Sequence, residues 1–334
     1  MVLHGGHVRR REFIEAMIGA TSATLWQLCA GAENALPVIG VLGTSGATDY
    51  NPMIAAFRKG LSETGYVEGK DVSFDYLWAD NQYNRLPELA SELVRRRVRL
   101  ILAAATPAAL AIRSLNATTP VVFAIGGDPV KIGLVSTLNR PEGNMTGAAH
   151  INVETAPKRL ELLHELLPTK QNFGLLTNPR SPLTASVETS VKAAADALGV
   201  KLTIHHASTD EEIDALFKEV AGGAEDGLVI GTDPFFTSRV TTLGQKSLRL
   251  RVPAIYQYRD FAAAGGTMSY GGDIKESYYL AGIYAGRILN GAKPSDLPVQ
   301  LSTRIEFFIN LESTKALGID APNALVGRAD EVIE

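Results

Sequence analysis

The chain contains 334 residues, of which 46% are hydrophobic and 20% are charged. This composition is typical of a folded globular protein, and the length favours two domains. A formal net charge of −4 argues against a nucleic-acid-binding surface. Cys29 is the single cysteine, so the sequence excludes an internal disulfide framework, and cleavage after Ala32 would also exclude a cysteine-based metal site.

Residues 1–32 have the pattern of an export signal. A cluster of arginines precedes a mostly apolar segment at 14–30, and a small-x-small cleavage sequence ends at Ala32. The pair Arg10-Arg11 followed by Phe13 favours the twin-arginine route, although two nearby glutamates leave general secretion open. A cytosolic amino-terminal helix is the alternative. We expect cleavage near Ala32 and a periplasmic mature protein.

The first part of the mature chain alternates predicted strands and helices. Short apolar runs bounded by turn residues indicate strands, and apolar positions at helical spacing indicate helices. This order predicts a doubly wound parallel sheet. In chain order we expect a strand at 38–42, a helix at 52–64, a strand at 72–77, a helix at 86–97, a strand at 100–102, a helix at 107–114 and a strand at 120–125.

The second part repeats this architecture without repeating the sequence. Two such α/β units facing each other leave one cleft, lined by the carboxyl ends of strands from both. Here we expect helices at 156–167, 184–198 and 277–289 and from 210 onward, with strands at 173–177, 202–204, 227–230, 253–256 and 305–309.

The segment 99–114 contains the clearest candidate for a binding turn. An apolar strand is followed by Thr106 at an expected N-cap and Pro107 at the first helical position. The amides of Ala108 and Ala109 would then point outward, where the positive end of the helix dipole favours an anionic group. A capped helix with water on these amides is the alternative.

Other strand ends supply further candidates. In the first part, Ser45, Gly46, Gly127 and Asp128 follow predicted strands, although Asp128 is better explained by an Asx bond that fixes its own turn. In the second part, Asn178 and Asp233 are the polar groups at strand ends. Asp233 could accept a ligand ammonium or cap the helix after Pro234, and these two roles are equally well supported.

Aromatic residues near the same turns could form a wall against a flat ligand. The candidates are Phe235, Phe236, Tyr256 and Tyr270, and each could instead belong to the core. Tyr50 and Trp78 are weaker candidates because they lie in predicted turns where exposure to solvent is the simpler interpretation.

Motifs for catalysis are missing from the sequence. It contains no Gly-x-Ser-x-Gly elbow, no Gly-x-x-x-x-Gly-Lys-Ser/Thr loop and no His-Glu-x-x-His pair. We therefore expect no enzymatic activity, no cofactor and no bound metal. An exported hydrolase or isomerase on an α/β scaffold is the alternative, and it would need a nucleophile–base pair or a metal cluster.

Six stretches together resemble the ABC-transporter substrate-binding protein family that includes tryptophan- and other aromatic amino-acid-binding proteins. They are AAFRKGL at 55–61, GYVEG at 65–69, DPVKIGLV at 128–135, LNRPEGNMTG at 138–147, DPFF at 233–236 and RADEVIE at 328–334. The resemblance implies a type I periplasmic binding protein, with two Rossmann-like lobes, three hinge crossings and a ligand enclosed between them. It also implies a membrane permease and an ATPase as partners.

This resemblance supports specific boundaries and a specific function. We expect lobe 1 at 37–148 and about 272–297, and lobe 2 at 149–271 and about 298–334. The expected function is capture of a small polar organic ligand by hinge closure, with an aromatic or branched amino acid as the first ligand class. In the amino-acid binders a hydroxyl and a helix N-terminus hold the ligand carboxylate, which supports this role for Thr106. We expect a monomer. A periplasmic sensor that docks on a membrane receptor is the alternative.

Overall fold

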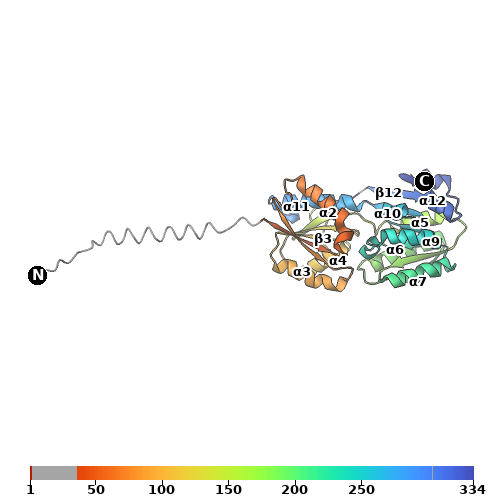
Figure 1. Cartoon of the computed structure of the whole chain (residues 1–334), viewed down its shortest axis with the longest axis horizontal. Helices are drawn as coiled ribbons and strands as arrows, with labels where there is room; N and C mark the ends of the chain where they lie inside the picture. Colours follow the sequence, from red (N-terminus) through yellow and green to blue (C-terminus); the bar gives the residue numbers. More distant parts are fainter. Residues whose placement is uncertain (2–35, 303) are drawn as a thin grey trace. The chain divides into compact units, whose positions relative to one another are not determined.

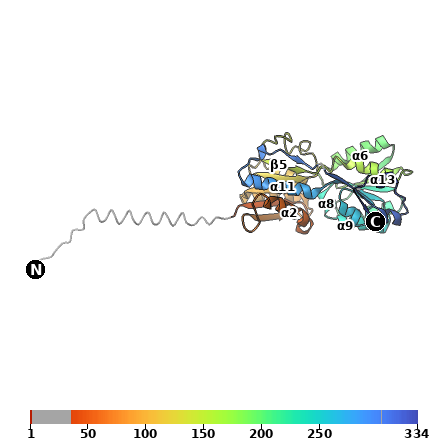
Figure 2. The ribbon, with the colours of Figure 1, turned by 90° about the horizontal axis from the view of Figure 1, so that it is seen from above.

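The computed structural model describes residue 1 and residues 36–302 and 304–334, so the predicted export signal lies outside the described residues. Residues 38–334 form one compact unit. Within this unit two β-sheets, each covered by helices, make two lobes (Figures 1 and 2). This arrangement confirms the predicted fold class. None of the described helices is both long and apolar enough to span a bilayer.

The sheet of the first lobe contains six parallel strands in the order β11-β5-β4-β3-β1-β2. The strands are β1 (Val38–Gly43), β2 (Ser73–Trp78), β3 (Leu100–Ala104), β4 (Val121–Ile125), β5 (Met145–Ala149) and β11 (Gln300–Leu301). The helices are α2 (Ala47–Ser62), α3 (Leu86–Arg95), α4 (Thr106–Ser114) and α11 (Ile274–Leu289), with a 3₁₀ turn at Tyr83–Arg85.

Alternation along β3 explains why helices cover both faces of this sheet. Leu100 and Leu102 belong to the core cluster that includes α2 and α11, whereas Ile101 and Ala103 belong to the cluster that includes α3 and α4. Figure 1 shows these two helix pairs on opposite sides of the sheet. A strand that is buried on both faces has apolar residues at every position, and the sequence of β3 has this pattern.

The sheet of the second lobe contains seven strands in the order β13-β12-β10-β9-β8-β6-β7, and β12 runs antiparallel to β10. The strands are β6 (Asn172–Thr177), β7 (Lys201–His206), β8 (Gly227–Ile230), β9 (Ala254–Tyr256), β10 (Met268–Gly272), β12 (Ile305–Asn310) and β13 (Glu331–Ile333). The helices are α5 (Ala156–Leu166), α6 (Thr184–Leu198), α7 (Asp210–Ala221), α8 (Pro234–Thr237), α9 (Val240–Leu250), α10 (Arg259–Ala263), α12 (Leu311–Ala316) and α13 (Asn323–Val326).

Three segments connect the two sheets, after β5, after β10 and after β11. The first two are joined by Asn152, whose side-chain oxygen accepts the Gly272 amide at 2.6 Å. Gln300–Leu301 pairs with β5 of the first sheet. The last crossing therefore follows Leu301, four residues beyond the expected boundary at about 297, because Gln300 and Leu301 still pair with the first sheet.

Several element boundaries differ from those expected. Strands β5 and β10 were not among the predicted strands, since their small residues and glycines lack a strong β pattern. Helix α2 begins at Ala47 instead of residue 52 and contains Pro52 in its interior. Helix α11 begins at Ile274 because Asp273 caps it, accepting the Lys275 amide at 2.8 Å.

Candidate functional site

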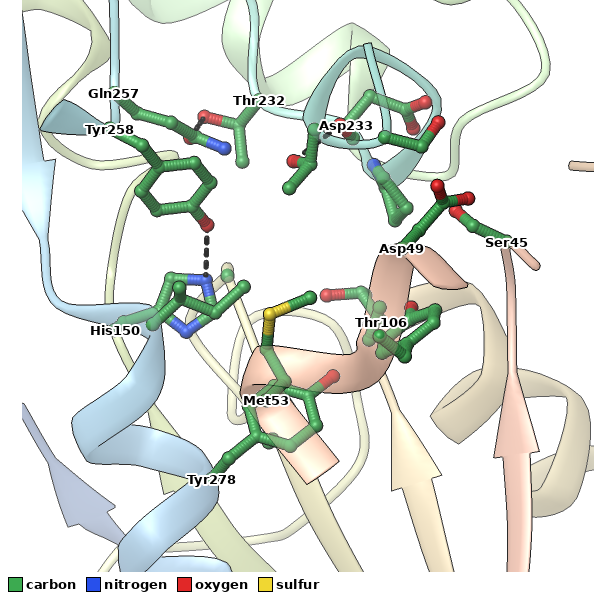
Figure 3. Close-up of a pocket in the computed structure, with 18 of the residues that line it drawn as sticks. Ser45, Asp49, Met53, Thr106, His150, Thr232, Asp233, Gln257, Tyr258 and Tyr278 are labelled. Carbon is green, nitrogen blue, oxygen red and sulfur yellow. Dashed lines mark hydrogen bonds between the residues drawn. The ribbon is translucent and has the colours of Figure 1, made fainter. Parts of the chain in front are cut away.

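A pocket of about 500 Å³, including its mouth, lies between the two sheets (Figure 3). None of its lining residues is classed as exposed. Both lobes contribute, as does the first crossing through His150. The lining residues are Ser45, Asp49, Tyr50, Met53, Ala105, Thr106, Ala124, Gly126, His150, Leu183, Thr232, Asp233, Pro234, Thr237, Ser238, Gln257, Tyr258, Ile274 and Tyr278.

Thr106 enters the pocket from the first lobe at the start of α4. Its side chain is 1% exposed, and its hydroxyl oxygen has no hydrogen-bond partner. Figure 3 shows this hydroxyl directed into the pocket. A buried hydroxyl without a partner loses free energy unless a ligand or water completes it. The geometry therefore suits a hydrogen-bonding ligand group at this point.

The predicted cap of this helix is wrong by one residue. Ala105 is the N-cap, so Thr106 is the first helical residue and Pro107 the second. The Ala109 amide donates to the Ala105 carbonyl at 3.1 Å and is not free for a ligand. Ala105 has φ = +84° and ψ = 163°, a backbone region that strongly favours glycine, and such strain is found at ligand sites.

Asp233 enters the pocket from the second lobe, at the carboxyl end of β8. One carboxylate oxygen, Oδ1, caps α8 by accepting the Phe235 amide at 2.9 Å and also accepts the Asn178 side-chain amide at 2.8 Å. The other oxygen, Oδ2, is buried and has no partner. Burial raises the pKa of this carboxyl group above its usual value. Asp233 thus combines the predicted cap with a second carboxylate oxygen that is buried and unpartnered, in a residue that lines the pocket.

Tyr83 connects the two lobes beside the pocket. It lies in the first lobe, and its hydroxyl donates to Oδ1 of Asp233 in the second lobe at 2.8 Å. The same hydroxyl accepts the Phe235 amide at 3.2 Å. Hydrogen bonds to charged groups are worth about 1.5–3 kcal/mol. This contact therefore favours an arrangement in which the lobes are close together.

The opposite end of the pocket is aromatic and apolar. Met53, Ile274 and Tyr278 come from the first lobe, and Tyr258 comes from the second. The Tyr258 hydroxyl lies 3.2 Å from Nε2 of His150 (Figure 3). Burial lowers the pKa of His150 to about 3, so this imidazole is neutral at physiological pH. The surface here suits an uncharged, flat or branched group.

A buried arginine supports the wall contributed by the second lobe. Arg159 is fully buried, and its guanidinium donates to the Thr232 hydroxyl and to the Asn152 carbonyl, both at 3.0 Å. The Thr232 hydroxyl in turn lies 2.7 Å from the side-chain oxygen of Gln257. No carboxylate pairs with Arg159 among the described residues. Its hydrogen bonds fix the pocket wall to the first crossing.

Of the predicted site residues, Ser45, Thr106 and Asp233 line the pocket together. The Ser45 hydroxyl donates to the side-chain oxygen of Asn81 at 3.0 Å. Gly46 lies next to the pocket as the N-cap of α2. Asn178 does not line the pocket, but its side-chain amide donates a hydrogen bond to Oδ1 of Asp233, which does.

The other predicted residues lie outside the pocket lining. Ala108 is part of the core beneath α3 and α4. Gly127 packs so closely that an added Cβ would lie 3.0 Å from Leu183. Oδ1 of Asp128 accepts the amides of Val130 and Lys131, the turn-fixing role favoured from the sequence.

The four predicted aromatic residues serve the core of the second lobe, Phe236 among them as a fully buried ring. Phe235 is 3% exposed, and Tyr256 is fully buried. The Tyr256 hydroxyl lies 2.9 Å from the Thr237 hydroxyl and so supports the pocket wall indirectly. Tyr270 packs edge-on against Phe307. Tyr50, in contrast, is buried and lines the pocket, where it stacks on Trp78, because helix α2 includes it instead of leaving it in a turn.

Sequence reasoning missed most of the apolar wall. Met53 and Tyr278 lie on helices, where an apolar residue indicates core packing and not a ligand surface. His150 follows β5 directly. The sequence of β5 lacks a clear strand pattern, so it gives no sign that His150 lies at a strand end. Gln257 and Tyr258 come directly after the predicted strand at 253–256, and this position was the available signal.

The described residues contain no group of three or more histidine, cysteine, aspartate or glutamate side chains that could hold a metal ion. The pocket instead presents an unpartnered hydroxyl and an unpartnered carboxylate oxygen from opposite lobes, together with the unpartnered Nδ1 of His150 and an apolar wall. Such a site can bind a small molecule that carries both a hydrogen-bond acceptor and a cationic donor.

Known proteins resemble this chain in sequence and in fold. The chain is 26% identical over 279 residues to a tyrosine-binding protein of Clostridioides difficile strain R20291, which covers 82% of this chain and 80% of the relative. A structure of an ABC domain from Streptococcus pneumonia in complex with L-Trp superposes with a TM-score of 0.80 at 25% identity, covering 90% of this chain and all of that chain.

A ligand-free, open structure of a substrate-binding protein with adhesive properties from Clostridium difficile gives a TM-score of 0.61 at 25% identity, covering 90% of this chain and 99% of that chain. The family model described as ABC transporter substrate binding protein matches residues 50–333. This match spans both lobes and nearly all of the described chain. The protein therefore belongs to the family of ABC transporter substrate-binding proteins.

Proposed function

We propose that this protein is the extracytoplasmic binding component of an ABC importer and that it binds an α-amino acid with an aromatic or branched side chain. Three pocket-lining residues carry a buried polar atom without a hydrogen-bond partner, His150 through its Nδ1, and the other two atoms carry the proposal. They are the Thr106 hydroxyl in the first lobe and Oδ2 of Asp233 in the second.

The two atoms match the two charged groups of an amino acid. The Thr106 hydroxyl can donate to a carboxylate, and the positive end of the α4 dipole adds favourable charge there. The ionised carboxylate of Asp233 can accept from an ammonium group. The side chain of the ligand would then lie against Met53, Tyr258 and Tyr278. The tyrosine-binding relative and the L-Trp complex support this ligand class.

Such a ligand would touch both lobes and so stabilise the closed arrangement over the open one. The similarity to the L-Trp complex (TM-score 0.80) exceeds that to the ligand-free, open structure (0.61), which supports a closed arrangement of this chain. Loaded protein would be recognised by a permease with its ATPase. The predicted export signal supports a periplasmic location, and membership of a family of substrate-binding proteins supports binding without catalysis.

A ligand screen and two substitutions test this proposal. L-Tryptophan, L-tyrosine, L-phenylalanine and L-leucine are titrated into the protein by calorimetry and by thermal shift. A true ligand at one hundred times its Kd adds about 2.7 kcal/mol to the free energy of unfolding. Thr106→Val should weaken binding by about tenfold or more, since it removes a hydrogen bond to a charged group. Asp233→Asn should weaken it further, because the ammonium loses its counter-charge.

Two matched variants control for general damage. Thr314→Val removes another buried helical hydroxyl, and Asp226→Asn changes another hydrogen-bonded aspartate of the second lobe. Both lie outside the pocket and should leave Kd unchanged. Normal binding by both pocket variants would refute the assignment of the two charged groups.

A further inference from the structure

A second, larger cavity adjoins the pocket on its solvent side. Its volume is about 1080 Å³ including the open solvent at its mouth, and residues classed as exposed, such as Pro52, Asp260 and Lys275, contribute to its lining. The two cavities share part of their walls. The shared residues are Asp49, Met53, Thr237, Ser238, Gln257, Tyr258 and Ile274. We call this space the outer cavity.

The two polar atoms that would fix an amino acid belong to residues that line the inner pocket alone. Thr106 and Asp233 line the inner pocket and are not part of the outer cavity. Of the residues that would contact the side chain, Met53 and Tyr258 line both cavities, whereas Tyr278 lines the inner pocket alone. A ligand held by its carboxylate and ammonium would therefore direct its side chain toward the outer cavity and not toward a closed wall.

We propose that the outer cavity is a second subsite, which takes the far end of the ligand side chain and favours a polar, cationic group there. This inference rests on the proposed function, since it needs the amino-acid group to be held at Thr106 and Asp233. It extends the ligand class to amino acids whose ring carries a further substituent.

The charges that line the outer cavity determine the preferred sign. Four carboxylates face two cationic side chains. Arg259 is already paired with Glu331, and Glu306 with Arg304 at 2.6 Å. Asp49, Asp260 and Asp273 then remain against Lys275, and neither Asp260 nor Lys275 forms an ion pair within the part of the chain that the structure describes. A cation is therefore favoured over an anion in this space.

Calorimetric titration of the full-length protein tests this subsite with a set of ring-substituted ligands. The set contains L-phenylalanine and L-tyrosine as parents, with 4-(aminomethyl)-L-phenylalanine and 4-carboxy-L-phenylalanine as the cationic and anionic probes. We expect both probes to bind, with the cationic probe favoured over the anionic one by about threefold or more at low salt. Asp260→Asn should reduce this ratio, whereas Asp320→Asn, an exposed aspartate outside the cavity, should preserve it.

Three results would overturn the inference. If a parent binds and neither probe does, the side-chain end of the pocket is closed and the outer cavity is not a subsite. If the anionic probe binds more tightly, the assigned preference is wrong. If neither parent nor probe binds, the proposed amino-acid function fails for ring side chains, and this inference fails with it.

Discussion

At the scale of single residues, Asp233 performs two tasks with its two oxygens. Oδ1 accepts hydrogen bonds from Tyr83, Asn178 and the Phe235 amide, while Oδ2 stays buried and free. Burying a carboxylate costs free energy unless its charge is compensated. The unpaired oxygen thus represents a cost in the empty protein, which an ammonium group would offset on binding.

The pH dependence of affinity follows from this carboxyl group. Burial raises its pKa above the usual value, and only the ionised form attracts an ammonium. Ligand affinity should therefore fall as the pH is lowered through this raised pKa, while the ligand ammonium itself stays charged. Calorimetric Kd values across this acidic range provide the measurement. The residual binding of Asp233→Asn should show a much flatter profile, and an equally steep profile would contradict the assignment.

The stability of the empty protein should change in the opposite direction. Because the folded-state pKa of Asp233 is raised, its contribution to stability is present below the unfolded-state pKa and is lost as the pH rises through the folded-state value. His150 opposes this trend, since its lowered pKa of about 3 makes the folded state lose stability as the pH falls below about 6.5. The difference between wild type and Asp233→Asn isolates the aspartate.

Sequence patterns singled out Ser45, Thr106 and Asp233 because each is a polar residue two or three positions after an apolar strand, and all three line the pocket. The same rule failed for Tyr256, whose ring remains in the core while its neighbours Gln257 and Tyr258 turn into the pocket. Pattern and spacing indicate where a strand ends. They do not determine which of the next residues points toward the cleft, because that depends on how the loop packs against the other lobe.

At the scale of elements, the contact between α2 and α11 shows how residue size determines helix placement. An ideal Cβ on Gly282 of α11 would lie 2.1 Å from the Phe57 carbonyl oxygen of α2. An ideal Cβ on Gly60 of α2 would lie 2.0 Å from the Tyr279 carbonyl oxygen of α11. The helices approach this closely only because both positions lack a side chain. These helices supply Met53, Ile274 and Tyr278 to the pocket.

Gly282→Ala should therefore destabilise the protein by about 2 kcal/mol, because the overpacking cost exceeds the gain in helix propensity. Chemical denaturation of wild type and variant gives this difference. Gly327→Ala is the matched control, since Gly327 is exposed and has φ = −66° at a helix end. An unchanged free energy of unfolding in Gly282→Ala would show that the two helices can separate without cost.

Element boundaries show where local rules were sufficient. The prediction of a helix at Thr106-Pro107 is confirmed, but its N-cap is Ala105 and not Thr106. Residue preferences would not predict alanine at a cap with a strained, positive φ. Strand β11 is only two residues long and joins the first sheet through pairing with β5. A strand this short has no periodic signal, so only the tertiary pairing reveals the position of the last crossing.

At the scale of the whole molecule, the Tyr83–Asp233 hydrogen bond connects the lobes at the site where the ligand is expected. Two lobes joined by crossings can separate, and any bond across the cleft raises the population of the closed state. A ligand that binds the closed state gains apparent affinity in proportion to that population. Tyr83 should therefore influence affinity without contacting the ligand.

Tyr83→Phe should increase the radius of gyration of the empty protein in solution scattering and weaken ligand binding by up to about tenfold, in line with the loss of one charged hydrogen bond. Tyr66→Phe is the control, because the Tyr66 hydroxyl bonds Asn290 within the first lobe at 3.0 Å. A Tyr83→Phe protein with unchanged scattering and unchanged Kd would show that this contact does not restrain the lobes.

The most direct test of amino-acid binding between the lobes is a crystal structure of the protein grown with L-tryptophan or L-tyrosine. We predict electron density in the inner pocket, with the ligand carboxylate within hydrogen-bond distance of the Thr106 hydroxyl and the ammonium within hydrogen-bond distance of Oδ2 of Asp233. Ligand density elsewhere, or the reverse orientation of the two charged groups, would contradict this account.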